Sequence, residues 1–410
     1  CMAATQNYAR WCWCFVSLVL ATVSCSALAA SVPHRRLPVR MTGALTAGDL
    51  ASVERAALAK ADQVRGEPFS DDELDRAQRS LRDLCPADTP IDFTSYRALV
   101  ASAAHRPHKQ WPATRAAAEQ LVTIVGTPDD APFRAIFQRV LDDGGWIAAE
   151  RAAVERTAVG REDRPWAVLV TGVNGIRKTS SIYQPWFEEV LCAALNSSSE
   201  SLPTGANSFF RQLDFIASTV ACEELKTLYT VGDLGAYSTF KDGVYSRYRT
   251  LAEMVGCLLV KQACQKQMNV MVETSGRDIA MYDYVDEMFD GYQKLVVHFE
   301  IDDLKLAESS VDRRMIGEQA AGRAALCAPP AEKAKALVAA NAGGPYGSAM
   351  LAGVQAESNS VWARVASDPK YAHWQKARVL VRAREGADWT AAAHANGAAE
   401  FAFGPPPKPK

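Results

Sequence analysis

Apolar positions in the first part of the chain repeat with a helical period. One stripe recurs every three or four residues, at Leu74, Ala77, Leu81 and Leu84. Ser70, followed three residues later by Glu73, is a capping-box sequence that marks the start of this helix. Similar stripes cover residues 50–61, 114–125, 131–141 and 146–158. Because this part has no clear strand-like run, we predict a helical N-terminal domain over residues 47–160.

The pattern changes after residue 160, where short apolar runs alternate with helical segments. Five runs have the character of strands: residues 166–171, 209–216, 269–273, 294–301 and 376–382. The clearest intervening helix covers residues 244–266. Continuous apolar strands separated by helices indicate a buried parallel sheet. We therefore expect an α/β fold, with a parallel sheet flanked by helices, over residues 161–390.

The two ends of the chain differ in composition from this core. Residues 1–48 contain no Asp or Glu, and an apolar run over residues 11–30 ends in an A-x-A type cleavage sequence, Ala27-Leu28-Ala29. An Arg-rich stretch follows. This order resembles the two-part presequence that delivers proteins to plastids bounded by extra membranes. We expect a cleaved targeting presequence over residues 1–46, which leaves no stable membrane anchor; secretion and an uncleaved anchor are the alternatives. The Pro-rich end, residues 391–410, is expected to be disordered.

Charge and cysteine usage argue against several functional classes. The chain has a net charge of −2, so no overall basic field favours nucleic acid as a partner. Its ten cysteines include no C-x-x-C pair, and its six histidines include no H-E-x-x-H sequence, so no zinc site is expected. Phosphate binding, if present, must come from a local site.

A glycine-containing turn follows the first strand and opens a helix. Its residues are Gly172, Val173, Asn174, Gly175, Ile176, Arg177, Lys178, Thr179 and Ser180. Glycines let backbone amides point at phosphate oxygens, and the helix N-terminus adds partial positive charge. Lys178 would reach the outer phosphates, and the Thr179 hydroxyl would bind Mg²⁺. The turn resembles the P-loop, G-x-x-x-x-G-K-[ST], except that Arg177 replaces the glycine before the lysine. Its side chain either crowds the phosphates or adds a cation to them.

Two acids stand where strands are expected to end. Asp214 lies in the second apolar run, near its end, where a lone buried carboxylate is costly. It is either a general base for an acceptor hydroxyl or a structural group, in a salt bridge or a helix N-cap. Glu273 ends the third run, where an acid holds Mg²⁺ through water or orients the attacking group. A structural ion pair is the alternative for Glu273.

Three arginines complete the candidate site. Arg277 follows the third strand closely and is either a phosphate ligand or part of a surface ion pair. Arg313 and Arg314 follow the fourth strand, in a segment that begins with the acids Asp302 and Asp303. We expect them either on a mobile lid that covers the transferred phosphate or as an exposed charge pair on a helix.

Together these residues resemble the zeta-toxin-like branch of P-loop kinases. The resemblance rests on the glycine-containing turn, Asp214, the sequence Val272-Glu273-Thr274 and the segment 310–314, and it covers residues 164–320. It implies ATP- and Mg²⁺-dependent phosphoryl transfer to a small hydroxyl-bearing molecule. Lys178 and a lid arginine would balance the negative charge, while Asp214 or Glu273 would orient the acceptor hydroxyl.

Two other functions fit part of the pattern. The sequence Gly-Val-Asn-Gly-x-x-Lys-Thr, a preceding helical domain and Glu-Thr-Ser-Gly-Arg277 resemble signal-recognition-particle GTPases. Those proteins specify guanine with Thr-Lys-x-Asp, and neither this tetrapeptide nor Asn-Lys-x-Asp occurs in the chain. The third hypothesis is a nucleotide-responsive binding module without catalytic turnover.

Overall fold

The computed structural model describes residues 66–158, 164–195, 202–383, 390–394 and 398–403. All of the described residues belong to one compact unit. The predicted presequence, residues 1–46, and the apolar stripe over residues 50–61 lie outside the described residues. Within the described part, no helix is both long enough and apolar enough to cross a membrane.

Helices occupy the described N-terminal part of the chain. They are α3 (Asp71–Leu84), α4 (Phe93–Ala103), α5 (Trp111–Val125), α6 (Ala131–Ile136), α7 (Gln138–Asp143) and α8 (Trp146–Ala158). The capping box is confirmed, because the Ser70 backbone amide donates to the Glu73 carboxylate at 2.8 Å and the Ser70 hydroxyl accepts from the Glu73 amide. The helix predicted over residues 131–141 is divided at Phe137 into α6 and α7. Helix α4 was not predicted.

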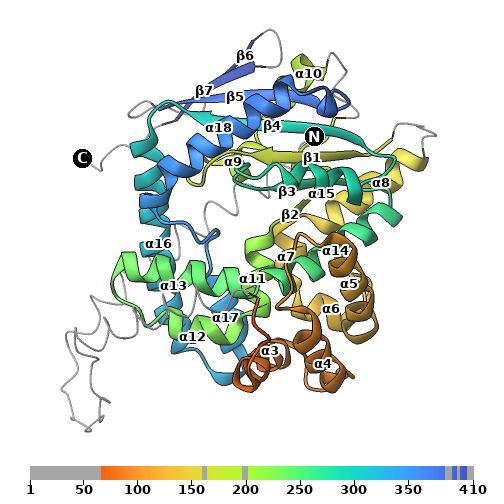
Figure 1. Ribbon diagram of the computed structural model, residues 1–410, viewed down its shortest axis with the longest axis vertical. Coiled ribbons are helices and arrows are strands. Elements are labelled where there is room, and N and C mark those ends of the chain that lie inside the picture. The colour runs from red at the N-terminus through yellow and green to blue at the C-terminus, as the bar shows by residue number, and fades with distance from the viewer. Residues whose placement is uncertain (1–65, 159–163, 196–201, 384–389, 395–397, 404–410) are drawn as a thin grey trace, which may run out of the picture. The chain divides into compact units, whose positions relative to one another are not determined.

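A seven-stranded sheet forms the second part. Its strands are β1 (Trp166–Thr171), β2 (Ser208–Arg211), β3 (Asn269–Glu273), β4 (Gln293–Ile301), β5 (Gln375–Ala383), β6 (Thr390–His394) and β7 (Ala398–Phe403). Their order is β2-β3-β1-β4-β5-β7-β6 (Figure 1). The five strands from β2 to β5 are parallel, as predicted, and β7 continues them while β6 pairs antiparallel to β7. Val170 pairs with both Glu273 and Val297, so the carboxyl ends of β1, β3 and β4 meet at one edge.

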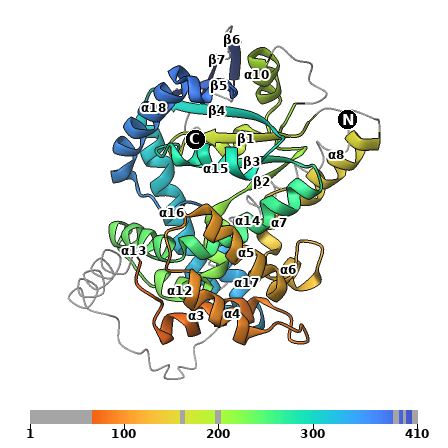
Figure 2. The same ribbon diagram turned by 45° about the vertical axis from the view of Figure 1, so that its right-hand side comes forward.

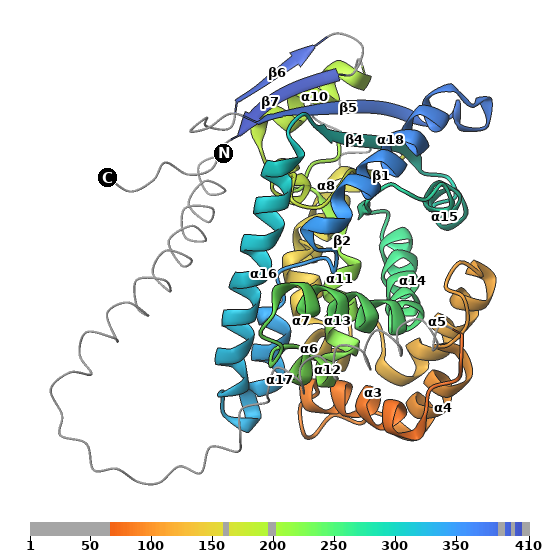
Figure 3. The same ribbon diagram turned by 60° about the vertical axis from the view of Figure 1, so that its left-hand side comes forward.

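Helices flank this sheet. They are α9 (Lys178–Ser181), α10 (Pro185–Leu195), α11 (Leu213–Val220), α12 (Cys222–Leu228), α13 (Leu234–Arg247), α14 (Arg249–Gln265), α15 (Ala280–Met288), α16 (Leu304–Leu326), α17 (Pro330–Ala340) and α18 (Leu351–Ser367). Two 3₁₀ turns, Ser348–Met350 and Pro369–Tyr371, flank α18. Helices α8 and α14 pack against β2, and α18 packs against β4. The long helix α16 runs from the sheet to α17 and is seen side-on in Figure 3.

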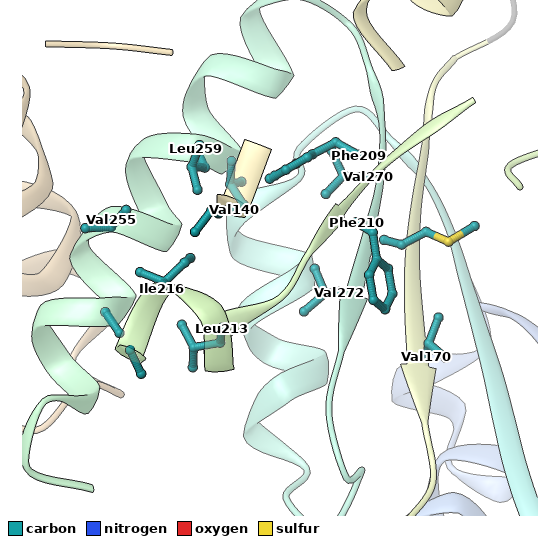
Figure 4. Close-up of a cluster of buried hydrophobic side chains, with 14 of the residues drawn as sticks. Val140, Val170, Phe209, Phe210, Leu213, Ile216, Val255, Leu259, Val270 and Val272 are labelled. Atoms are coloured by element: carbon teal, nitrogen blue, oxygen red, sulfur yellow. The ribbon is translucent and has the colours of Figure 1, made fainter. Parts of the chain in front are cut away.

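The N-terminal helices and the sheet share one apolar core. Between them, side chains from α7, α11 and α14 meet those of β1, β2 and β3, including Val140, Ile216 and Leu259 (Figure 4). Burying one such side chain is worth about 1.5–3 kcal/mol relative to exposing it. Helix α5 packs on α14, and α8 on β2 (Figure 2), so the N-terminal helices support the strands at the β2 edge of the sheet.

Three sequence predictions need correction. The run 209–216 is a strand only to Arg211, and helix α11 begins at Leu213 because its apolar residues face α14 and α3 at helical spacing. The helix predicted over 244–266 is two helices, α13 and α14, that meet at Tyr248. Residues 391–410 were expected to be disordered, yet β7 and most of β6 lie there. Their alanine-rich sequences have little intrinsic strand preference, and they are strands because β7 pairs with β5 and β6 pairs with β7.

Candidate functional site

The turn after β1, residues 172–177, is called the glycine turn below. Gly172 has φ of 128° and Gly175 has φ of 86°, a region that disfavours side chains. A Cβ on Gly172 would lie 2.4 Å from the Phe299 carbonyl oxygen, and one on Gly175 would lie 2.4 Å from that of Ala307. Both positions therefore need glycine, because β4 and α16 approach the turn closely.

The Lys178 side chain folds back onto the glycine turn. Its side chain is buried, and Nζ donates hydrogen bonds to the carbonyls of Gly172 at 2.6 Å and Val173 at 2.8 Å. The same nitrogen lies 3.4 Å from Oε1 of Glu273. Burial lowers the pKa of Lys178, and the Glu273 carboxylate acts against this shift. The ammonium group is therefore held between the turn and the end of β3.

Thr179 and Glu273 place two oxygen ligands side by side. The Thr179 hydroxyl donates to Oε2 of Glu273 at 3.1 Å. Mg²⁺ prefers oxygen ligands and is usually held by one or two carboxylates together with substrate phosphates. The pair fits that requirement, although the described residues contain no cluster of three or more His, Cys, Asp or Glu suited to a metal ion. Glu273 thus has the ion pair expected as one alternative, and it also lines a cavity that opens beside the glycine turn.

Arg177 adopts a backbone conformation that is unusual for its type. Its φ is 61° and its ψ is 30°, in the left-handed region. Its side chain is half-buried, and burial together with the charge of Arg313 lowers its pKa. Arg177 thus adopts a conformation that glycine adopts more readily, and its side chain adds a cation to the turn.

The helix that follows the glycine turn is shorter than expected. Helix α9 contains four residues, Lys178–Ser181, and α10 begins after a break. The partial positive charge expected from the N-terminus of this helix is therefore small, because aligned peptide dipoles add along the length of a helix. Val173 and Ile176 are buried among apolar residues, while Asn174 and Ser180 line the cavity beside the turn.

Asp214 lies in the first turn of α11 rather than at a strand end. It forms no ion pair among the described residues, and the N-cap position belongs to Gln212, so neither structural alternative applies. Burial, reinforced by the nearby Glu273 carboxylate, raises the pKa of Asp214. A carboxylate with a raised pKa is better suited to accept a proton near neutral pH than an ordinary one.

The two arginines of α16 point to different surroundings. Arg314 lines the cavity, and its Nη2 donates to the Gly344 carbonyl at 2.8 Å. Its Nε is buried and has no hydrogen-bond partner among the described residues. Arg313 is exposed and does not line the cavity. Both lie on the 23-residue helix α16, which follows β4, so they are on a helix as both alternatives expected.

Arg277 also lines the cavity, and its hydrogen-bond partner is an uncharged side chain. Its Nη2 donates to the Tyr346 hydroxyl at 2.7 Å, and its guanidinium lies 4.8 Å from the centre of that ring. The ion pair expected as the alternative role does not form within the described part of the chain. Tyr346 lies two residues after Gly344, and the side chains of Asn174 and Asp214 pack against Gly344. Residues 344–346 therefore contact the glycine turn, Asp214 and Arg277.

A buried network holds this segment in place. Lys241 pairs with Glu318, both fully buried, and donates to the side chain of Asn341 at 3.0 Å and the carbonyl of Gly343 at 2.7 Å. Burial lowers the pKa of Lys241 to about 8. A buried pair of this kind is costly to break from one side, by roughly 3–5 kcal/mol.

One cavity of about 810 Å³ brings most of the predicted residues together. Asn174, Gly175, Arg177, Lys178, Thr179, Ser180, Asp214, Glu273, Arg277 and Arg314 line it. Its wall carries nine Lys or Arg residues against four acids, Asp214, Asp242, Glu273 and Asp278. On a chain of net charge −2, this is a local positive field suited to an anionic ligand.

Part of the cavity wall was not predicted from sequence. Arg249 lies at the start of α14, and Tyr346 lies in a loop, where no periodic pattern marks them. The one available signal is Gly343-Gly344-Pro345, which marks a turn but not its place in the fold. Comparison with protein-family models, curated proteins and solved structures finds no match to this chain.

Proposed function

We propose that the chain is a P-loop kinase of the zeta-toxin-like branch, which transfers a phosphoryl group from ATP to a small hydroxyl-bearing molecule. The observation that carries the proposal is the meeting of Lys178, Thr179 and Glu273 at the carboxyl ends of β1 and β3. The chain connects from β1 toward β2 and from the neighbouring β4 toward β5, so the connections diverge beside the end of β1, and such crevices are the usual ligand sites of open α/β sheets.

Each residue has a distinct role in this proposal. Lys178 and Arg177 bind the phosphates, and Thr179 and Glu273 hold Mg²⁺, which supplies further positive charge when bound. Arg314 offsets charge that develops on the transferred group. Asp214 accepts the proton of the acceptor hydroxyl as that oxygen bonds to the phosphorus and the bond to the leaving ADP breaks. The arrangement works by positioning and charge rather than by covalent catalysis.

The non-catalytic binding module is kept as the second candidate because of one observation. Lys178 Nζ is already engaged by two carbonyls of the glycine turn and by Glu273. Nucleotide binding without turnover would result if Lys178 did not leave those partners. The GTPase is distinguished by its nucleotide, since it requires GTP rather than ATP.

The test is a turnover assay with a panel of acceptors. ADP and GDP release is measured with Mg·ATP and Mg·GTP, in the presence of polyols, sugars, sugar phosphates and nucleosides. Lys178→Met gives the background rate, since methionine keeps the volume of the lysine side chain without its charge. We expect ATP-dependent release that one acceptor stimulates. Release no faster than in Lys178→Met with every acceptor would contradict catalysis, and a strong preference for GTP would favour the GTPase.

A further inference from the structure

The cavity extends well beyond the glycine turn. Arg211 ends β2, and the sheet order β2-β3-β1 places it two strands from the turn. Neighbouring strands are about 4.8 Å apart, so the end of β2 is roughly 10 Å from the end of β1. The wall beyond it is built by residues 104–109 and by the junction of α13 and α14. We call this part of the cavity the acceptor end.

One buried carboxylate at the acceptor end serves two arginines. Glu253 is fully buried and pairs with Arg211, itself buried, through Oε2. Its other oxygen, Oε1, accepts from Nη2 of Arg249 at 2.8 Å and from Nε at 3.1 Å. Burial would raise the pKa of Glu253, but the two arginines together hold it below its ordinary value. The three groups therefore carry one net positive charge.

The surroundings of Arg211 and Arg249 differ from those of a simple ion pair. The Nε of Arg211 is buried and has no hydrogen-bond partner among the described residues. Gly256 leaves room for its guanidinium, because a Cβ there would lie 2.6 Å from Nη2 of Arg211. Arg211 and Arg249 both line the cavity, and Arg249, whose side chain is 36% exposed, is the more accessible of the two. It also begins the 17-residue helix α14, whose N-terminus attracts negative charge.

Arg277 adds a second cation to the same space. It is exposed, and its described contacts are both with neutral Tyr346. Lys109, also in the wall, is already paired with Asp278. His108 is uncharged near neutral pH, because burial and Arg249 lower its pKa to about 4. Arg106, which is exposed, and the acid Asp242 line the cavity as well. The charges of Arg249 and Arg277 both act on Tyr346, so these two cations lie in the same part of the cavity.

We propose that the acceptor end binds an anionic group of the phosphoryl acceptor, a phosphate or a carboxylate, through Arg249 and Arg277. The acceptor is then a hydroxyl-bearing anion rather than a neutral polyol. Its hydroxyl lies beside Asp214, and its anionic group lies toward β2. That the bound anion is the phosphoryl acceptor rests on the proposed function. That the two arginines bind an anion does not.

The experiment titrates inorganic phosphate and malonate into the protein by calorimetry. One series uses the wild type saturated with Mg·AMP-PNP, so that the glycine turn is occupied. A second series uses Lys178→Met without nucleotide, which removes the principal cation of the turn. Each series includes Arg249→Gln, Arg277→Gln and the matched control Arg364→Gln, which lies on α18 outside the cavity.

We expect at least one of the two anions to bind in both series. Arg249→Gln and Arg277→Gln should each weaken it by about tenfold or more, as the loss of a charge-assisted hydrogen bond does, while Arg364→Gln leaves it unchanged. Binding of neither anion, or equal affinity in the cavity variants and the control, would overturn the proposal. If Arg249→Gln does not fold, Arg277→Gln decides, because Arg277 is exposed. Failure of AMP-PNP to bind would count against the proposed function alone, since the Lys178→Met series needs no nucleotide.

Discussion

Replacing Arg177 separates backbone strain from phosphate binding. A residue other than glycine in the left-handed region costs roughly 1–2 kcal/mol, and Arg177 is there at φ 61°. Arg177→Gly removes this cost but adds about 0.5–1 kcal/mol of chain entropy on folding. Arg177→Ala keeps the strained backbone. We therefore expect the glycine variant to be more stable than the alanine variant by about 1 kcal/mol.

Both variants remove the same cation from the cavity. If Arg177 contacts the phosphates, each should bind Mg·ATP about tenfold or more weakly, because a hydrogen bond to a charged group is worth about 1.5–3 kcal/mol. Urea unfolding gives the two free energies of unfolding, and calorimetry gives the two dissociation constants. Equal stability of the variants would refute the strain argument. Tighter ATP binding in both would show that the Arg177 side chain crowds the phosphates instead.

Two other substitutions test individual roles. Arg314→Gln should lower kcat by about 10²–10³ with little change in the dissociation constant for ATP, while Arg313→Gln, outside the cavity, should have a much smaller effect; steady-state kinetics and calorimetry compare them, and equal losses would contradict the assignment. Asp214→Asn should lower kcat by about 10²–10⁴ and yet stabilise the fold at pH 8. The folded-state pKa of Asp214 is raised, so its charge costs stability as pH rises from its ordinary value of about 3.9 through the raised one. Thermal unfolding of both proteins should show a gain at pH 8 that vanishes near pH 4, and a variant less stable at pH 8 would contradict the raised pKa.

The parallel sheet was predictable because its strands are buried on both faces. Residues 166–171 and 269–273 are continuous apolar runs, and their predicted bounds agree with β1 and β3. The run 209–216 misled because it is short and its apolar residues, at positions 209, 210, 213, 215 and 216, fit neither period cleanly, so the pattern does not separate a strand from a helix. Strand β7 pairs with β5 and strand β6 pairs with β7, and their alanine-rich sequences carry no such signal.

The site was predictable where it is local in sequence. Lys178 and Thr179 follow the glycine turn directly, and Glu273 ends an apolar strand, so sheet geometry alone brings them together. Arg249 and Tyr346 reach the same cavity through contacts between distant segments. Nothing in the spacing of residues 249 and 346 indicates that they line the same cavity, and the acceptor end therefore required the structure.

The central claim is that Lys178 binds the phosphates of ATP, and calorimetric titration of Mg·ATP tests it most directly. Wild type is compared with Lys178→Met and with Lys261→Met, a control on the far part of α14 whose lysine pairs with Glu119 on the surface. Circular dichroism confirms that each variant is folded. The account predicts saturable binding to wild type and Lys261→Met, and none to folded Lys178→Met. Unchanged affinity in Lys178→Met, or no binding to the wild type, would contradict it.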